Sequence, residues 1–297
     1  METSASSRLN LPKSRRESEL HPQCFGREYG GCPERSIPVQ RMSTDPNNPR
    51  QKKHRRKQQS PRTRTKHSNT TDPADPSAGL PHQYPVVEGG PTLTGAYTGE
   101  GAIFSVNAPV IADLSYEFSL SQLWIVAGDS SNIDTAEVGW HVFPSGYPSD
   151  YPLAPHLFIY WTADIAIYVE FDAQIPGWAL VIDNTVVGYW PSIVYNTLQI
   201  SADSVEFGGE IAPATIPTYT AMGSGAFPSQ GYPIAACQRN VFYVDSAGNS
   251  FDSDNIVLHV TNLYCYTLLI EEEAPSNEWA SFFFFGGPGA LNPACVS

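Results

Sequence analysis

Two glutamates in this 297-residue sequence have neighbours that favour burial of a carboxyl group. Glu137 lies in AEVGWHV, directly before Gly-Trp, and Glu210 ends the segment VEFGGE. A carboxyl group next to tryptophan and small residues loses hydration when the chain folds, which raises its pKa. Two such groups in one cleft titrate apart, so that one serves as an acid and the other as a base. The two could then activate a water molecule and protonate a leaving amine or sugar oxygen.

The same glutamates also fit a structural role, in which each faces solvent from a strand. Asp164, in YWTAD, is a third candidate that could support the site or cap a turn. Residues 271–273 (EEE) form a charge run, which predicts a solvated edge or turn. The residues alone leave the structural and the catalytic interpretations of Glu137 and Glu210 open.

Other catalytic chemistries have no matching motif. No glycine-rich stretch precedes Lys and Ser or Thr, so the sequence contains no phosphate-binding loop. The histidines and cysteines lack metal-ligand spacing, and His141, His156 and His259 are predicted to be packed or surface residues. Residues 223–225 (GSG) lack the G-x-S-x-G spacing of a serine nucleophile. We therefore expect no metal and no cofactor.

Charge divides the chain into two parts. Residues 1–70 hold 16 of the 17 Lys and Arg but only 6 of the 30 Asp and Glu and two aromatic residues. Such a segment buries too little apolar area to offset its ordering entropy, which predicts disorder. Residues 71–90 are rich in Pro and Gly and are predicted to be a linker. We therefore expect a disordered basic arm and linker over 1–90 and a folded domain over 91–297.

The basic stretch 52–66 allows three interpretations: a solvated tail, a nuclear-localisation or nucleic-acid arm, or a pro-segment that packs on an acidic body. Residues 71–297 hold 24 acidic residues and one base, Arg239, a balance of −23 that repels phosphates, so no nucleic-acid partner is expected. No apolar run approaches the roughly 18 residues of a membrane span. The N-terminal segment METSASSRLNLPKSRRESEL has no apolar core of a secretory signal.

The folded part must place its side chains on strands. From about Gly95 onward, short runs rich in Val, Ile, Tyr, Phe and Trp are separated by Gly, Pro, Asn and Asp at spacings of ~8–15 residues. No strand–helix–strand alternation occurs, and only residues 192–200 could form a helical turn. The pattern predicts an all-β fold, an antiparallel β-sandwich of two packed, jelly-roll-like sheets. Residues 282–285 (FFFF) are apolar on both faces, which predicts a central strand.

Five cysteines and the shortage of lysine bear on the compartment. Cys265 and Cys295 flank a predicted C-terminal hairpin and could form a disulfide in an oxidising compartment. Cys237 lies in a small apolar run and is predicted to be a buried thiol, whereas Cys24 and Cys32 lie in the arm. So few basic residues suit an extracellular protein that works in acid. We expect the domain to be more stable at mildly acidic pH, because its carboxylates repel one another at neutral pH.

Seven segments in order resemble the neprosin family, and together they span roughly residues 99–295. The segments are FSLSQLWIV (118–126), AEVGWHVFP (136–144), LFIYWTAD (157–164), VVGYWP (186–191), VEFGGEI (205–211), TAMGSGAFP (220–228) and FFFFGGPGALNPAC (282–295). The resemblance implies a secreted β-sandwich and a glutamic endopeptidase that is active in acid and cleaves after proline. It also implies that Glu137 and Glu210 face each other across a concave surface as the catalytic pair.

In the implied mechanism one ionised glutamate takes a proton from the attacking water. The other glutamate, kept protonated by burial and by its partner's charge, polarises the scissile carbonyl. The sequence does not say which glutamate has which role. Gln122, Trp140, Tyr160 and Tyr189 are expected to line the cleft or support the oxyanion, although core packing explains each of them equally well. We expect a proline-containing peptide or protein as partner, no membrane, and a monomer.

The chain departs from the family pattern in three ways. The segment after Asp164 is shortened, no activation domain is recognisable ahead of the sandwich, and no signal peptide is visible. Three functions therefore compete: an acid-acting glutamic peptidase, a catalytically inactive neprosin-like binding module of the cell wall or extracellular space, and a glycoside hydrolase that uses the same two carboxylates. The expected extracellular localisation rests on family and composition alone.

Overall fold

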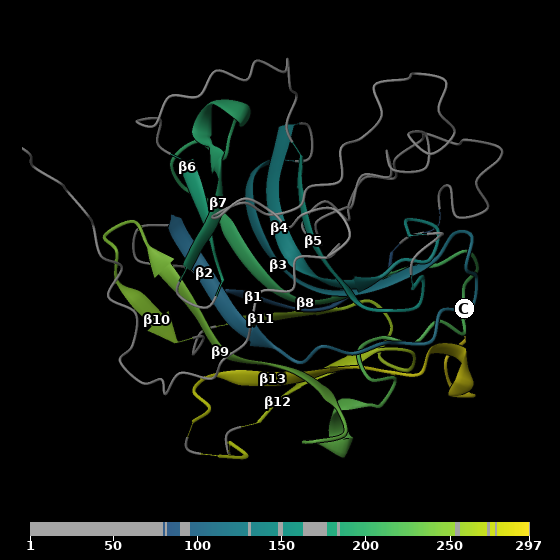
Figure 1. Ribbon diagram of the computed structural model, residues 1–297. Helices are drawn as coiled ribbons and strands as arrows, with labels where there is room; N and C mark the ends of the chain where they lie inside the picture. The colour runs from purple at the N-terminus through teal and green to yellow at the C-terminus, as the bar shows by residue number, and fades with distance from the viewer. Residues whose placement is uncertain are drawn as a thin grey trace, which may run out of the picture.

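The structure of the protein is a computed structural model (Figure 1). It describes residues 80, 82–89, 96–129, 132–147, 151–162, 177–182, 185–252, 256–271, 274–276 and 278–296. The predicted basic arm over residues 1–70, with Cys24 and Cys32, lies outside the described residues, as does Asp164.

The described part of the chain is all-β, with thirteen strands, three short 3-10 helices and no α-helix, which confirms the predicted fold class. The strands are β1 (Pro85–Gly89), β2 (Tyr97–Phe104), β3 (Phe118–Asp129), β4 (Asn132–Val142), β5 (His156–Thr162), β6 (Gly177–Ile182), β7 (Thr185–Pro191), β8 (Ser204–Ala212), β9 (Ala236–Asp245), β10 (Ser250–Asp252), β11 (Ile256–Val260), β12 (Thr267–Ile270) and β13 (Phe282–Gly286). The 3-10 helices are η3 (Ser192–Val194), η4 (Pro228–Gln230) and η5 (Gly289–Leu291), and η3 lies where the sequence predicts a helical turn. Among these residues, no helix has the length and apolar character needed to cross a membrane.

Two antiparallel sheets form the body, and a hairpin stands beside them (Figure 1). The six-stranded sheet has the order β11-β1-β8-β3-β4-β5. The five-stranded sheet has the order β10-β9-β13-β12, with β2 paired to β9, and β6 pairs with β7 in the separate hairpin. In Figure 1 the strands β3, β4 and β8 of the larger sheet are visibly curved. The larger sheet therefore has a concave face that is turned away from the smaller sheet.

Alternate residues of each strand build the core between the sheets. Phe207 and Ile211 of β8 belong to one buried cluster with Leu123 of β3 and with Phe283 and Phe285 of β13. Because successive side chains on a strand point to opposite faces, the intervening residues of β3 and β8 lie on the concave outer face. The predicted central strand is confirmed, since β13 lies between β9 and β12 and all of its residues are buried.

β1 lies inside the stretch that the composition predicts as linker. Val86 and Val87 are fully buried, and the strand pairs with β8 on one side and with β11 on the other. The segment PVVEG resembles a linker because proline and glycine surround it, but two paired neighbours place it inside the larger sheet. The sandwich therefore takes in residues ahead of the predicted boundary at residue 91.

The three described cysteines behave as the sequence predicts. Cys265 and Cys295 form a disulfide, with their Cα atoms 4.7 Å apart. Cys237 on β9 is a buried free thiol. The disulfide closes the segment that carries β12 and β13, so it secures the edge of the smaller sheet to the last described residues of the chain.

Two carboxyl groups away from Glu137 and Glu210 are buried for structural reasons. Glu117 accepts hydrogen bonds from the Ala214 amide and the Thr218 hydroxyl, each at 2.8 Å. Asp134 accepts a hydrogen bond from the Asn196 amide at 2.7 Å. Each carboxylate thereby ties a loop to the larger sheet. Burial alone therefore does not mark a carboxyl group in this fold as catalytic.

Candidate active site

Glu137 and Glu210 lie on β4 and β8, the two neighbours of β3. Across β3, Glu137 is opposite Trp124 and Glu210 is opposite Leu120. Gln122 is midway between Trp124 and Leu120, so all five residues share the concave face. From strand spacing and rise, the two glutamate Cα atoms lie about 10 Å apart across the sheet and about 13 Å apart along it. Their side chains must reach toward Gln122 to act together.

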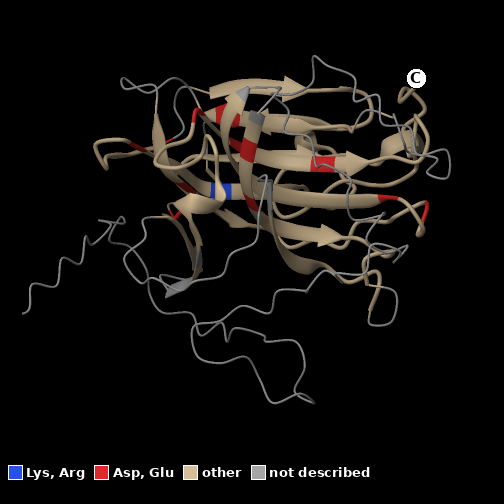
Figure 2. Cartoon of the chain, turned by 90° about the horizontal axis from the view of Figure 1, so that it is seen from above, with Lys and Arg blue, Asp and Glu red and all other residues tan. Residues whose placement is uncertain are grey.

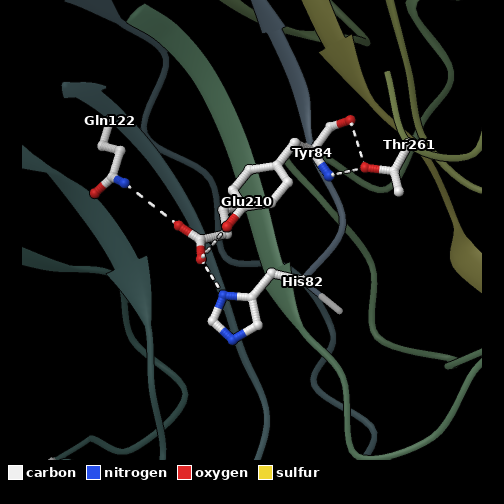
Figure 3. Close-up of polar contacts among 5 residues, drawn as sticks. All are labelled: His82, Tyr84, Gln122, Glu210 and Thr261. Atoms are coloured by element: carbon white, nitrogen blue, oxygen red, sulfur yellow. Dashed lines mark hydrogen bonds and ion pairs between the residues drawn. The ribbon is translucent and has the colours of Figure 1, made fainter. Parts of the chain in front are cut away.

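Gln122 connects the two glutamates. Its Nε2 atom donates to Glu210 Oε2 at 3.4 Å (Figure 3). A hydrogen bond from the same side chain favours the charged form of Glu137 and lowers the pKa of that group. Gln122, Glu137 and Glu210 have no exposed surface, and hydrogen bonds are electrostatically stronger in such low-dielectric surroundings. The structure thus brings these three predicted site residues together.

Glycine flanks Gln122 on both neighbouring strands. Gly139 of β4 and Gly208 of β8 are its direct cross-strand partners. A Cβ atom at Gly139 would lie 2.1 Å from the Ser121 carbonyl oxygen, and one at Gly208 would lie 2.3 Å from the Pro85 carbonyl oxygen. The backbones therefore approach too closely for any other residue. This explains why each glutamate motif, E-x-G-W and G-G-E, contains a glycine two positions from its glutamate.

Glu210 is surrounded by hydrogen-bond donors (Figure 3). The Nδ1 atom of His82 makes a short contact with Oε1, and the Tyr84 hydroxyl donates to the same oxygen at 3.4 Å. Gln122 supplies the third donor, at Oε2. A carboxylate offers about four lone-pair sites, so one site on Oε2 remains for a further donor such as water. Three side chains thus fix the orientation of this carboxyl group.

Glu137 has a different environment, which favours its protonated form. Burial first, and then the charge of Glu210, raise the pKa of Glu137 well above its ordinary value. The Thr135 hydroxyl, which donates to Oε1 at 2.8 Å, and Gln122 lower this pKa, and the charge of Glu206 raises it. Interacting carboxyl groups release their protons in two separate steps. The surroundings therefore assign the proton of the pair to Glu137.

Three buried polar atoms on this face have no hydrogen-bond partner among the described residues. They are Gln122 Oε1, Glu137 Oε2 and Trp124 Nε1. About nine-tenths or more of buried polar groups in proteins are paired with protein or water. An amide oxygen, a carboxyl oxygen and an indole N–H can together accept from and donate to water or a peptide group. In the part of the chain that the structure describes, no cluster of His, Cys, Asp and Glu could hold a metal ion.

The remaining predicted site residues have different outcomes. Tyr160 of β5 is directly opposite Glu137, and burial, followed by the charges of Glu137 and Glu210, raises the pKa of its hydroxyl. Tyr160 thus lies close to both carboxyl groups. Trp140 is three positions from Glu137 on β4, so its side chain is on the other face of the sheet and is not brought to the pair. Tyr189 is on β7, and its side chain lies outside the described part.

Three residues that contact the glutamates, His82, Tyr84 and Thr135, are not predicted from the sequence. His82 and Tyr84 lie in a proline-rich segment, and Glu210 is 128 residues from His82 along the chain. No local signal could connect them. Thr135 is two positions before Glu137 on a strand, which places both side chains on one face. That spacing could have identified Thr135 from the sequence.

A family model described as Neprosin matches residues 115–177 and 164–288. The chain belongs to the neprosin family. The matched residues include Gln122, Glu137 and Glu210, whereas His82 and Tyr84 lie ahead of them. The two neprosin matches overlap at residues 164–177, in the region where the sequence predicts a shortened sheet. Neprosin membership places the chain in a prolyl endopeptidase-like peptidase family with peptide substrates, and its disulfide is typical of extracellular proteins.

Proposed function

We propose that this neprosin-family protein is an extracellular, acid-acting glutamic endopeptidase that cleaves peptides near proline. Water is activated by Glu137 and Glu210. The observation that carries the proposal is the position of Gln122 between two fully buried glutamates on one concave face. Two carboxyl groups whose surroundings differ in this way divide into an acid and a base. The acid range and the preference for proline rest on family membership.

Glu210 is the base in the proposed mechanism. The open lone pair on Oε2 accepts a proton from the water that attacks the scissile carbonyl carbon. Protonated Glu137 donates a hydrogen bond to the carbonyl oxygen while negative charge develops there, and it then gives its proton to the leaving amine. Transfer of the proton from Glu210 to Glu137 through solvent restores the starting state. Each turnover consumes one water molecule and one peptide bond.

The direct test replaces each glutamate by its neutral isostere in the full-length chain. Glu137→Gln and Glu210→Gln are incubated with proline-containing peptides at pH 3–5, and products are read by mass spectrometry. Loss of the acid or the base lowers the rate of cleavage by about 10²- to 10⁴-fold, while circular dichroism shows an unchanged fold. Glu278→Gln, at an exposed position, is the control and cleaves at the wild-type rate. Wild-type cleavage by either test variant removes that glutamate from the mechanism.

A binding module for proline-containing peptides is the second candidate. The full burial of both carboxyl groups favours it, because a substrate that cannot reach the pair is held without being cleaved. A peptide that binds to the wild-type protein and is recovered uncut at every pH from 3 to 7 supports this function instead. A polysaccharide incubated in parallel tests the glycoside hydrolase, which predicts release of sugars from that sample only.

A further inference from the structure

The strongest feature that the proposed mechanism does not use is the pairing of His82 with Glu210. His82 Nδ1 and Glu210 Oε1 are in short contact and form an ion pair when the imidazole is protonated. The Glu210 side chain has no exposed surface, and that of His82 is 15% exposed. The imidazole also meets the edge of the Phe118 ring, with the ring centres 5.8 Å apart. The Phe118 ring therefore covers part of the His82 imidazole and helps to exclude water from the pair.

Backbone pairing fixes His82 in this position. The Gln83 amide donates to the Ile211 carbonyl oxygen at 3.0 Å, and the Ile211 amide donates back at 2.9 Å. The Tyr84 amide donates to Thr261 Oγ1 at 2.7 Å. Extending this register places Tyr84 opposite Glu210, with His82 diagonal to Glu210 on the same face. Two neighbouring strands thus hold the segment that carries His82.

Four of the titratable groups near the pair are acids. They are the Tyr84 hydroxyl on the same segment, Glu206 on β8, Glu137 on β4 and the Tyr160 hydroxyl on β5. Arg239 on β9, blue in Figure 2, is the only Lys or Arg among the described residues, and its guanidinium group packs over the Trp279 ring. Among the described residues, His141 of β4 also lies on this face and shares the cross-strand partner Leu120 with Glu210, but His82 is the imidazole that contacts Glu210.

We propose that His82 is a positioning residue of the Glu137–Glu210 site, which holds the Glu210 carboxyl group oriented toward Gln122. This inference rests on the proposed peptidase function. The contact occupies Oε1 of Glu210 and leaves Oε2 directed toward Gln122 and the attacking water. An opposite charge within hydrogen-bond distance favours the charged form of a carboxyl group.

The matching experiment compares two histidines that each face a glutamate. His82→Gln removes the charge beside Glu210 but keeps an amide of similar reach. His259→Gln removes the same charge from the pair that His259 Nε2 forms with Glu88 Oε2 at 2.8 Å on β11 and β1 of the same sheet. Full-length variants cleave a proline-containing peptide from pH 3 to 7, and kcat/KM is measured at each pH.

The acid limb of the profile distinguishes positioning from stability. In His82→Gln the loss of activity toward low pH begins at a higher pH than in the wild type, because the carboxyl group has lost its positive neighbour, whereas His259→Gln keeps the wild-type limb. A lower rate with an unmoved limb would show that His82 is only structural. An equal displacement of the limb in both variants would also overturn the inference, because the effect would then be one of general charge.

A second readout does not depend on cleavage. Proton NMR at pH 4–5 detects an imidazole N–H that is protected from exchange by the carboxylate of Glu210. We expect this signal in the wild type and in His259→Gln, and we expect its loss in both His82→Gln and Glu210→Gln. Detection of the signal in an inactive wild type would leave the pairing established and refute the peptidase. An active wild type without the signal would refute the role of His82 alone.

Discussion

Gln122 is the side chain through which Glu137 and Glu210 interact. One amide group can contact both carboxyl groups because it carries two N–H donors. It donates to Glu210 at 3.4 Å and lowers the pKa of Glu137, while its own oxygen has no partner among the described residues. A neutral amide neither takes nor releases a proton in the working pH range. Gln122 can therefore orient the two carboxyl groups without competing for the proton they exchange.

Replacement of Gln122 tests this role. We expect Gln122→Ala to lower kcat by about 10²-fold, the loss typical of one preorganised donor in an active site. Because Gln122 lowers the pKa of Glu137, its removal also moves the alkaline limb of the activity profile to higher pH. Steady-state kinetics between pH 3 and 8 measure both changes. The control is Gln199→Ala, which removes an amide that donates to the Tyr195 carbonyl oxygen at 3.2 Å and keeps the wild-type profile. An unchanged kcat in Gln122→Ala would contradict the orienting role of Gln122.

The sequence predicts these residues to different degrees. Glu137 and Glu210 could be identified because their neighbours in the sequence, tryptophan and glycine, predict that the two side chains are buried. Trp140 could have been set aside, because residues three apart on a strand face opposite sides of the sheet. His82 could not be found, because its contact with Glu210 depends on how β1 pairs with β8, and that pairing joins segments more than 120 residues apart.

At the scale of elements, the close approach of β4, β3 and β8 determines where the two carboxyl groups meet. Gly139 allows β4 to approach β3 beside Gln122, and Gly208 allows β8 to approach β1. On the core side of the larger sheet, the side-chain amide of Gln238 on β9 donates hydrogen bonds to the backbone carbonyl oxygens of Gln122 and Gly208, at 3.3 and 3.2 Å. The smaller sheet thus supports the strands of the site. The spacing of the strands, and with it the reach of each glutamate to Gln122, is fixed by backbone contacts.

An added methyl group on β4 tests this spacing. In Gly139→Ala the new Cβ atom meets backbone atoms of β3 at 2.1 Å, which forces the strands apart. We expect a loss of about 3 kcal/mol in the free energy of unfolding, at the upper end of overpacking effects, and a loss of cleavage in any protein that folds. Gly99→Ala on β2 is the matched control, because its Cβ atom makes an ordinary 3.4 Å contact with Val244. Urea unfolding of both variants gives the comparison, and equal stabilities would refute the spacing argument.

The element scale also shows which parts of the fold the sequence can predict. β13 is predicted correctly because four consecutive phenylalanines need cover on both faces, wherever the strand lies. β1 is missed because its two valines stand between prolines and glycines, and only its neighbours β8 and β11 make it a central strand. Local composition predicts a buried strand when the strand's own residues are apolar enough to require burial, as in β13. Local composition does not predict a strand such as β1, which is central only because distant segments pair with it.

At the scale of the whole molecule, the excess of acidic residues links stability to pH. Figure 2 marks Asp and Glu positions in both sheets and their loops, whereas Arg239 is the only Lys or Arg among the described residues. Burial, followed by the charge of Glu206, raises the pKa of Glu100 well above its ordinary value. Burial and Glu210 do the same for Glu137. Ionisation of Glu100 and Glu137 is therefore less favourable in the folded state than in the unfolded chain, so it lowers the free energy of unfolding.

We therefore expect the full-length protein to be more stable at pH 5 than at pH 7. A carboxyl group with a raised pKa in the folded state binds more protons there than in the unfolded chain, so stability falls as the pH rises above the ordinary value of about 4.5. Hydrogen bonds with Asn249 and its neighbours lower the pKa of Asp245. This shift changes the stability only below about pH 3.8, so it does not oppose the trend between pH 5 and 7. Urea unfolding at pH 5 and 7 measures the difference. Glu100→Gln reduces this difference in stability, because it removes one of the two carboxyl groups with a raised pKa. Glu278→Gln, at an exposed position, leaves the difference unchanged. A wild-type protein that is more stable at pH 7 than at pH 5 would contradict the linkage.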